Sequence, residues 1–117
     1  MAGVTTHVLD TTIGRPAVGM MIEFSIVTDG DWRLLKTETT NADGRTDNPL
    51  LTVPGIQVGI YRLVFGVADY FRSRGVNLPE PPFLDRVPIQ FGIADTGSHY
   101  HVPLLCTPWT YSTYRGS

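Results

Sequence analysis

Two histidines stand two positions apart near the end of the chain, His99 and His101 in the stretch HYHVPLL. Successive side chains of a β-strand point to opposite faces, so both imidazoles lie on one face if this stretch is extended. An imidazole has an unperturbed pKa of about 6.5 and therefore suits the transfer of a proton near neutral pH. Tyr114 and Arg115 follow in the final stretch YSTYRGS. The spacing favours a polar site built on a sheet, although it also fits an exposed strand with no chemical role.

The elements that carry these side chains are predicted from alternation and from turn residues. Residues 99–106 alternate in character, residues 107–110 supply a turn, and residues 110–116 form a last strand at a sheet edge. Together they predict a terminal β-hairpin. The earlier strands are predicted over residues 4–10, 20–27, 32–40, 59–66 and 85–94.

The remaining segments complete the fold class. Pro88 lies inside the strand 85–94 and argues for an edge position or a bulge, because proline cannot donate to a sheet ladder. One helix is predicted over residues 68–74, ended by Gly75, and residues 48–57 are predicted to be irregular. About seven to eight short strands with one short helix favour an all-β, two-sheet β-sandwich. We expect residues 1–117 to form a single domain.

Composition excludes several classes of protein and partner. The formal net charge of -2 offers no basic surface for nucleic acid. Cys106 is the only cysteine, so no disulfide can form within the chain. No stretch approaches the roughly 20 apolar residues of a membrane helix. The first residues, MAGVTTHVLD, lack the basic and apolar segments of a signal peptide, and we therefore expect a cytoplasmic protein.

Four motifs in order along the chain resemble those of the 5-hydroxyisourate hydrolases, the transthyretin-related enzymes of urate breakdown. They are THVLD with His7, TNADGR with Arg45, HYHVP with His101, and the terminal YSTYRGS. The resemblance covers essentially the whole chain. Two departures, Cys106 and Trp109, lie near the predicted hairpin turn and do not touch the charged groups.

The resemblance implies a fold, a substrate and a set of site residues. It implies a transthyretin-like sandwich that assembles as a homotetramer, a dimer of dimers, with the site in a channel between subunits. The substrate implied is 5-hydroxyisourate, with no metal and no cofactor. The catalytic residues implied are His7, Arg45, His101 and Ser117, and the substrate-binding residues implied are His7, Arg45 and Tyr114.

These residue types suit the hydrolysis of a cyclic amide. Water adds to a ring carbonyl and a ring nitrogen is expelled, which opens 5-hydroxyisourate to 2-oxo-4-hydroxy-4-carboxy-5-ureidoimidazoline. His7 and His101 can move the proton from the water to the leaving nitrogen. Arg45 can stabilise the developing oxyanion, and Tyr114 can stack on the flat substrate. We expect Ser117 to orient the water or a histidine, and we do not expect it to act as a covalent nucleophile.

Three other interpretations stay open. A transthyretin-like carrier would bind a small ligand without hydrolysing it, although the polar set of His7, His101 and Tyr114 argues against carriage. His7, His99 and His101 could instead hold a zinc ion, but a His-x-His pair alone is a weak indication of a metal site. The fold alone also fits a sandwich without activity.

Overall fold

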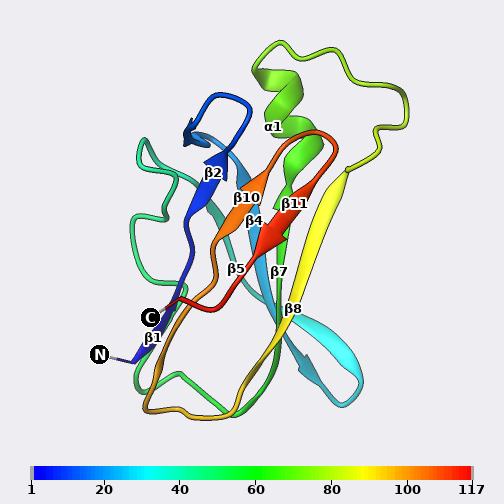
Figure 1. Cartoon of the computed structure of the whole chain (residues 1–117). Helices are drawn as coiled ribbons and strands as arrows, with labels where there is room; N and C mark the ends of the chain where they lie inside the picture. The colour runs from blue at the N-terminus through cyan, green and yellow to red at the C-terminus, as the bar shows by residue number, and fades with distance from the viewer. Residues whose placement is uncertain (1, 117) are drawn as a thin grey trace.

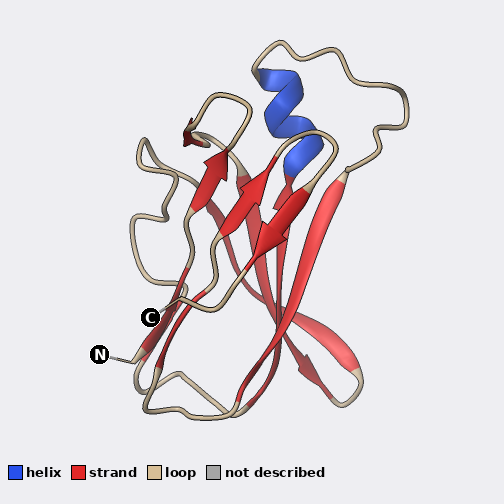
Figure 2. Ribbon diagram, in the orientation of Figure 1, coloured by secondary structure: helices blue, strands red, loops and turns tan. Residues whose placement is uncertain are grey.

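The computed structural model describes residues 2–116, which form eleven strands and one helix. The elements in chain order are β1 (Gly3–Thr5), β2 (Val8–Asp10), β3 (Arg15–Pro16), β4 (Met21–Thr28), β5 (Asp31–Thr39), β6 (Leu51–Thr52), β7 (Gly59–Gly66), α1 (Val67–Ser73), β8 (Arg86–Ile93), β9 (His99–His101), β10 (Leu104–Cys106) and β11 (Tyr111–Thr113). The strands lie in two layers, and the helix covers one end of them (Figure 2).

One layer is an antiparallel sheet with the strand order β5-β4-β7-β8. Its strands are eight or nine residues long. In β7, buried side chains at Tyr61, Leu63 and Phe65 alternate with more exposed ones, whereas β5 at the edge has no buried residue. β8 lies at the edge of this sheet, and its Pro88 stands opposite Val64. The edge position predicted from Pro88 is therefore confirmed.

The second layer consists of two smaller sheets, β6-β1-β9 and β11-β10-β2-β3, which meet end to end. β1 pairs in parallel with β9, and β2 pairs in parallel with β10 in the same register. The ladder is interrupted at Thr6 and His7, which lie beside Val102 and Pro103. The two segments stay hydrogen-bonded across the interruption, because Val102 donates to the Thr5 carbonyl and Leu104 donates to the His7 carbonyl, both at 2.9 Å. β9 lies between β1 and Gly116, because it pairs with β1 along one edge and with Gly116, through His101, along the other. Figure 1 shows the blue β1 and the red C-terminal segment in the same part of the molecule.

The core lies between the two layers. Phe24 of β4 stacks on Tyr61 with ring centroids 5.4 Å apart, and Tyr61 also stacks on Phe91 with ring centroids 6.0 Å apart. The second layer contributes fully buried aliphatic side chains, among them Val8 and Leu104. This core holds the second layer in place, and its outer face is then free to carry polar groups.

The helix closes one end of the sandwich. Val67 and Phe71 of α1 are fully buried, and the Tyr70 hydroxyl donates a 2.8 Å hydrogen bond to Oδ2 of Asp10. Asp10, which is 2% exposed, also accepts hydrogen bonds from the backbone N–H and the hydroxyl of Thr12. This Asp10 cluster (Asp10, Thr12 and Tyr70) ties β2 to the helix.

The predicted fold class, an all-β sandwich with one short helix, is confirmed. The strand predicted over residues 4–10 is wrong in one respect, because it divides into β1 and β2 at the interruption opposite Pro103. The short strands β3 and β6 were not predicted, and β6 falls within the region 48–57 that was expected to be irregular. The helix begins one residue earlier than predicted, at Val67. No helix within residues 2–116 combines the length and apolar character needed to cross a membrane.

Candidate active site

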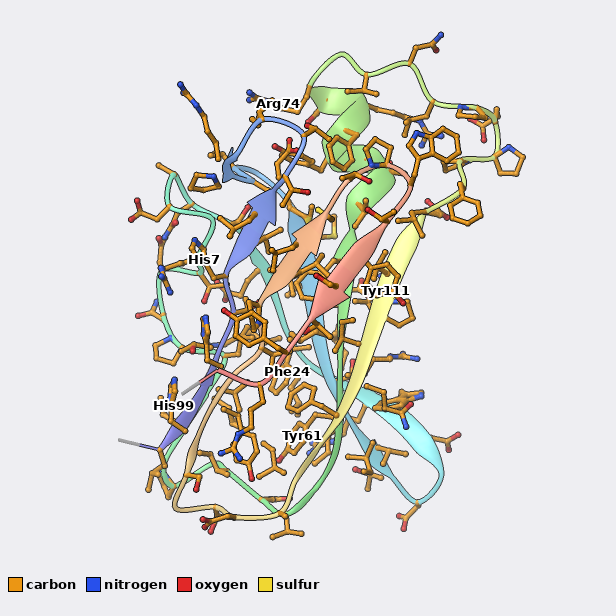
Figure 3. All side chains as sticks on the ribbon, in the orientation of Figure 1. His7, Phe24, Tyr61, Arg74, His99 and Tyr111 are labelled. Carbon is orange, nitrogen blue, oxygen red and sulfur yellow. The ribbon has the colours of Figure 1, made fainter. Side chains whose placement is uncertain are left out.

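His99 and His101 lie on the outer face of the second layer, as their spacing predicted. Both are half-buried, whereas Tyr100 between them is 6% exposed and points into the core. Figure 3 shows His7 and His99 on the same side of the molecule, away from the core residues Phe24 and Tyr61. The three histidines therefore occupy one region of the surface, although His7 comes from the opposite end of the sequence.

A threonine joins the two histidines of β9. Oγ1 of Thr5 lies 3.0 Å from Nε2 of His99 and 2.9 Å from Nδ1 of His101. The parallel register explains this geometry, because Thr5 of β1 stands opposite His101 and Gly3 stands opposite His99. Thr5 was not predicted as a site residue. The only indication in the sequence was that Thr5 and His7, two positions apart in the predicted strand 4–10, lie on the same face.

Arg45 reaches the site through a tight turn. The backbone of Arg45 pairs with that of His7 in an isolated antiparallel bridge, and Val8 donates a 2.8 Å hydrogen bond to the carbonyl of Gly44. Gly44 has a φ of +74°, and a side chain there would collide with the carbonyl oxygen of Val8. The turn can therefore approach β2 only with glycine at position 44. The turn brings Arg45 beside His7, which lies nearly forty positions earlier in the chain.

The charge of Arg45 acts on two histidines. Partial burial lowers the pKa of His7, and the neighbouring positive charge of Arg45 lowers it further, against an opposing contribution from Asp43. Burial also lowers the pKa of His101, with Arg45 and then His7 and His99 adding to the effect. Both causes disfavour the imidazolium form. The site therefore favours neutral imidazoles near pH 7, the form in which a histidine accepts a proton.

The end of the chain packs against His101. Gly116 pairs with His101 in an antiparallel bridge, in which the Gly116 N–H donates a 2.7 Å hydrogen bond to the His101 carbonyl. A Cβ on Gly116 would come within 2.9 Å of Cδ2 of His101. Arg115 lies over the ring of Tyr100 at 4.2 Å, and its Nη2 donates to the carbonyl of His99. Ser117, the last predicted catalytic residue, lies outside the described residues.

The concave surfaces around these groups are separate in one protomer. One hollow of about 670 Å³ is lined by Ser98, His99, Tyr114, Arg115 and Gly116. Another, of about 160 Å³, has Thr5 and Arg45 in its lining. Tyr114 is 60% exposed, and within residues 2–116 no hydrogen bond joins it to His7 or Arg45. The fold thus gathers His7, Arg45 and His101, whereas Tyr114 lies at the rim beside His99.

The alternative metal site gains no geometric support. Within residues 2–116, no group of three or more histidine, cysteine, aspartate or glutamate side chains is placed to hold a metal ion. The rings of His99 and His101 are instead turned toward the hydroxyl of Thr5. Cys106 of β10 is fully buried in the core, and burial raises the pKa of its thiol to about 12. A buried thiol of this kind is not a reactive group.

The sequence matches known proteins along nearly its full length. Residues 4–116 match the model of the HIUase/Transthyretin family. A protein named 5-hydroxyisourate hydrolase 2, from Rhizobium meliloti (strain 1021), is 59% identical over 114 residues, which make up 97% of this chain and 94% of that protein.

Solved structures of two related proteins share the fold. The structure of Klebsiella pneumoniae 5-hydroxyisourate hydrolase aligns with a TM-score of 0.81 and 32% identity, covering 100% of both chains. Sea bream transthyretin, solved in complex with thyroxine, aligns with a TM-score of 0.87 and 27% identity, covering 98% of this chain and 95% of that one. The same fold therefore occurs both in a protein named as a hydrolase and in a protein solved with bound thyroxine.

Proposed function

The chain belongs to the HIUase/Transthyretin family, and from this premise we propose that it hydrolyses 5-hydroxyisourate in urate degradation. The observation that carries the proposal is the convergence of His7, Arg45 and His101 on one outer face. A ligand carrier has no need of two histidines whose pKa is lowered by partial burial and by a neighbouring guanidinium. The identity of 59% with a named hydrolase, against 27% with transthyretin, points the same way.

The geometry supports a division of roles. His101 and His7, both with a lowered pKa, act as the groups that take a proton from water and return it to the leaving ring nitrogen. Arg45 binds the carbonyl oxygens of the substrate and stabilises the negative charge that develops on them during attack. Neither role requires a covalent intermediate. Ser117 orients the water or a histidine, a role that follows from the family resemblance.

The separate hollows support a site completed by assembly. Thr5 and Arg45 line one hollow and His99 and Tyr114 line the other, and neither encloses a flat bicyclic substrate. A second copy facing this layer would close the space between them. The edge strands β8 and β11 can each add a strand from another copy. We therefore propose a homotetramer, a dimer of dimers, in which Tyr114 contacts the substrate from the rim.

A direct assay tests the function. Purified protein is mixed with freshly generated 5-hydroxyisourate, and the decay of its ultraviolet absorbance is compared with the spontaneous decay. We expect a large acceleration that persists after extensive dialysis against a chelator. Mass spectrometry of enzyme quenched during turnover should show the unmodified chain. An unchanged decay rate together with tight binding of thyroxine would favour a carrier instead, and an acyl adduct on any residue would contradict direct attack by water.

A further inference from the structure

The shared hydroxyl between His99 and His101 carries an inference beyond the roles given above. We propose that Thr5 and His99 are positioning residues for the hydrolysis, and that they hold His101 with its proton on Nδ1 and its lone pair on Nε2. The inference rests on the proposed function, because the geometry alone allows two arrangements of the protons, but the proton positions can be measured without any substrate.

The hydrogen bonds constrain the protons strongly. A threonine hydroxyl has a single proton, so it can donate to only one of the two ring nitrogens that contact it. With both rings neutral, the other ring must donate to the hydroxyl oxygen. Either His101 donates through Nδ1 and Thr5 donates to His99, or His99 donates through Nε2 and Thr5 donates to His101. The proton on one ring thus determines which nitrogen of the other ring carries a proton.

The reaction distinguishes the two arrangements. In the first, Nε2 of His101 has a lone pair that can accept a proton as the O–H bond of water breaks and the water oxygen bonds to the ring carbonyl. His101 then carries protons on both nitrogens, and its Nδ1–H still donates to Thr5. The Nε2 proton passes to the ring nitrogen as the C–N bond breaks and its electron pair moves to that nitrogen. In the second arrangement, Nδ1 of His101 accepts the Thr5 proton and Nε2 already carries a proton, so Nε2 has no lone pair with which to accept a proton from water.

The surroundings of His101 agree with the first arrangement. Its Cδ2 edge lies against Gly116 and its Nδ1 is bonded to Thr5, so Nε2 is the ring nitrogen left for the substrate. Within the described range no hydrogen bond to Nε2 is present. A histidine is commonly oriented by a hydrogen bond on one nitrogen while the other nitrogen acts. Here the orienting group is a hydroxyl, and His99 orients that hydroxyl.

Nuclear magnetic resonance of the assembled protein tests the proton positions without any substrate. With ¹⁵N-labelled histidine at pH 8, we expect the shifts of His101 in the wild type to report the Nδ1–H tautomer. In Thr5→Val, which keeps the shape of the side chain and removes its hydroxyl, we expect a mixture of tautomers. Thr5→Ser should restore the wild-type pattern. A wild-type His101 in the Nε2–H tautomer would overturn the proposal.

Kinetics test the consequence. Loss of a group that orients a functional histidine typically costs about 10- to 100-fold, and we expect Thr5→Val to lower kcat by this factor with little change in KM. His99→Phe should lower kcat less, and the double variant should be no slower than Thr5→Val, because the chain of hydrogen bonds is already broken. A wild-type kcat in Thr5→Val, or effects that multiply in the double variant, would count against the proposal.

Thr6→Val provides the matched control. The Thr6 hydroxyl is buried on the opposite face and donates a 2.7 Å hydrogen bond to the carbonyl of Val102. We expect this variant to lose stability while His101 keeps its tautomer. If Thr5→Val fails to fold, the tautomers of the wild type, Thr5→Ser and His99→Phe still decide the question. A wild type that is inactive toward 5-hydroxyisourate would contradict the proposed function and leave the measurement of the proton positions unaffected.

Discussion

Two polar clusters lie on the second layer, one on each of its faces, and they differ in how far their hydrogen bonds are satisfied. In the Asp10 cluster, a carboxyl that is 2% exposed accepts three hydrogen bonds, from Tyr70 and from two groups of Thr12. In the cluster of Thr5, His99 and His101, a single hydroxyl is hydrogen-bonded to two half-buried rings, and the second nitrogen of each ring does not contact this hydroxyl. A satisfied and buried cluster stabilises the fold, whereas a half-satisfied and half-exposed cluster has groups available to a substrate.

The sharpest test of this contrast removes the imidazole that is proposed to take the proton. We expect His101→Asn to lower kcat/KM for 5-hydroxyisourate by about 10² to 10⁴, since this is the usual contribution of a positioned general base. The free energy of unfolding, measured in urea, should change little because the ring is only half-buried. A variant of wild-type activity would remove His101 from the mechanism.

The converse test removes a donor from the Asp10 cluster. Tyr70→Phe leaves a buried carboxyl oxygen without its partner, and we expect the free energy of unfolding to fall by about 1–3 kcal/mol. The activity per folded molecule should be unchanged. Tyr61→Phe is the matched control, because that hydroxyl bonds the backbone of the exposed Gln57 and should cost about 1 kcal/mol or less. A loss of activity in Tyr70→Phe without loss of stability would contradict the view that the Asp10 cluster stabilises the fold and takes no part in the reaction.

The smallest expected effect concerns charge. Arg45→Met removes a positive charge that lowers the pKa of both His7 and His101, so both values should rise toward about 6.5 in a nuclear magnetic resonance titration. Arg33→Met, which changes an exposed arginine of β5, should leave both values unchanged. A shift of equal size in the two variants would show that Arg45 has no specific effect on the site.

The same pKa values predict how stability depends on pH. A histidine whose folded-state pKa is lowered binds its proton less readily than in the unfolded chain. The free energy of unfolding of the wild type should therefore be highest above pH 6.5 and should decrease as the pH falls through the lowered values of His7 and His101. In Arg45→Met this decrease should be smaller. Denaturant titrations between pH 8 and pH 5 measure it.

The elements best predicted from the sequence were those with strong local patterns. The strand at Gly59–Gly66 has the predicted bounds because its alternation is regular over its whole length. The terminal hairpin follows from the turn at 107–110 and is antiparallel as expected. Its strands are shorter than predicted, because residues 99–106 divide into β9 and β10 and β11 covers only Tyr111–Thr113. The helix was displaced by a single residue, since Gly66 caps it without any side-chain hydrogen bond that the sequence could indicate.

The features that escaped prediction depend on partners distant in the chain. Alternation gave residues 4–10 as one strand, whereas the structure divides it into β1, which pairs with β9, and β2, which pairs with β10. β3 and β6 have two residues each, too few for any periodicity. His7, Arg45 and His101 were predicted through motifs, and their catalytic roles stay predictions; Thr5 was not predicted because only the pairing of β1 with β9 places it opposite His101. Tyr114 and Ser117 remain predictions that rest on the family resemblance.

The parallel pairing of β1 with β9 also has a consequence for the order of events during synthesis. Thr5 meets His101 across a separation of 96 residues, so a growing chain cannot bring the two together until residue 101 has left the ribosome. Contacts of such long range form slowly. The edge of β1 that pairs with β9 is therefore still unpaired when all residues of β4, β5, β7 and β8 have been synthesised. The contact of Thr5 with His99 and His101 therefore forms late in folding.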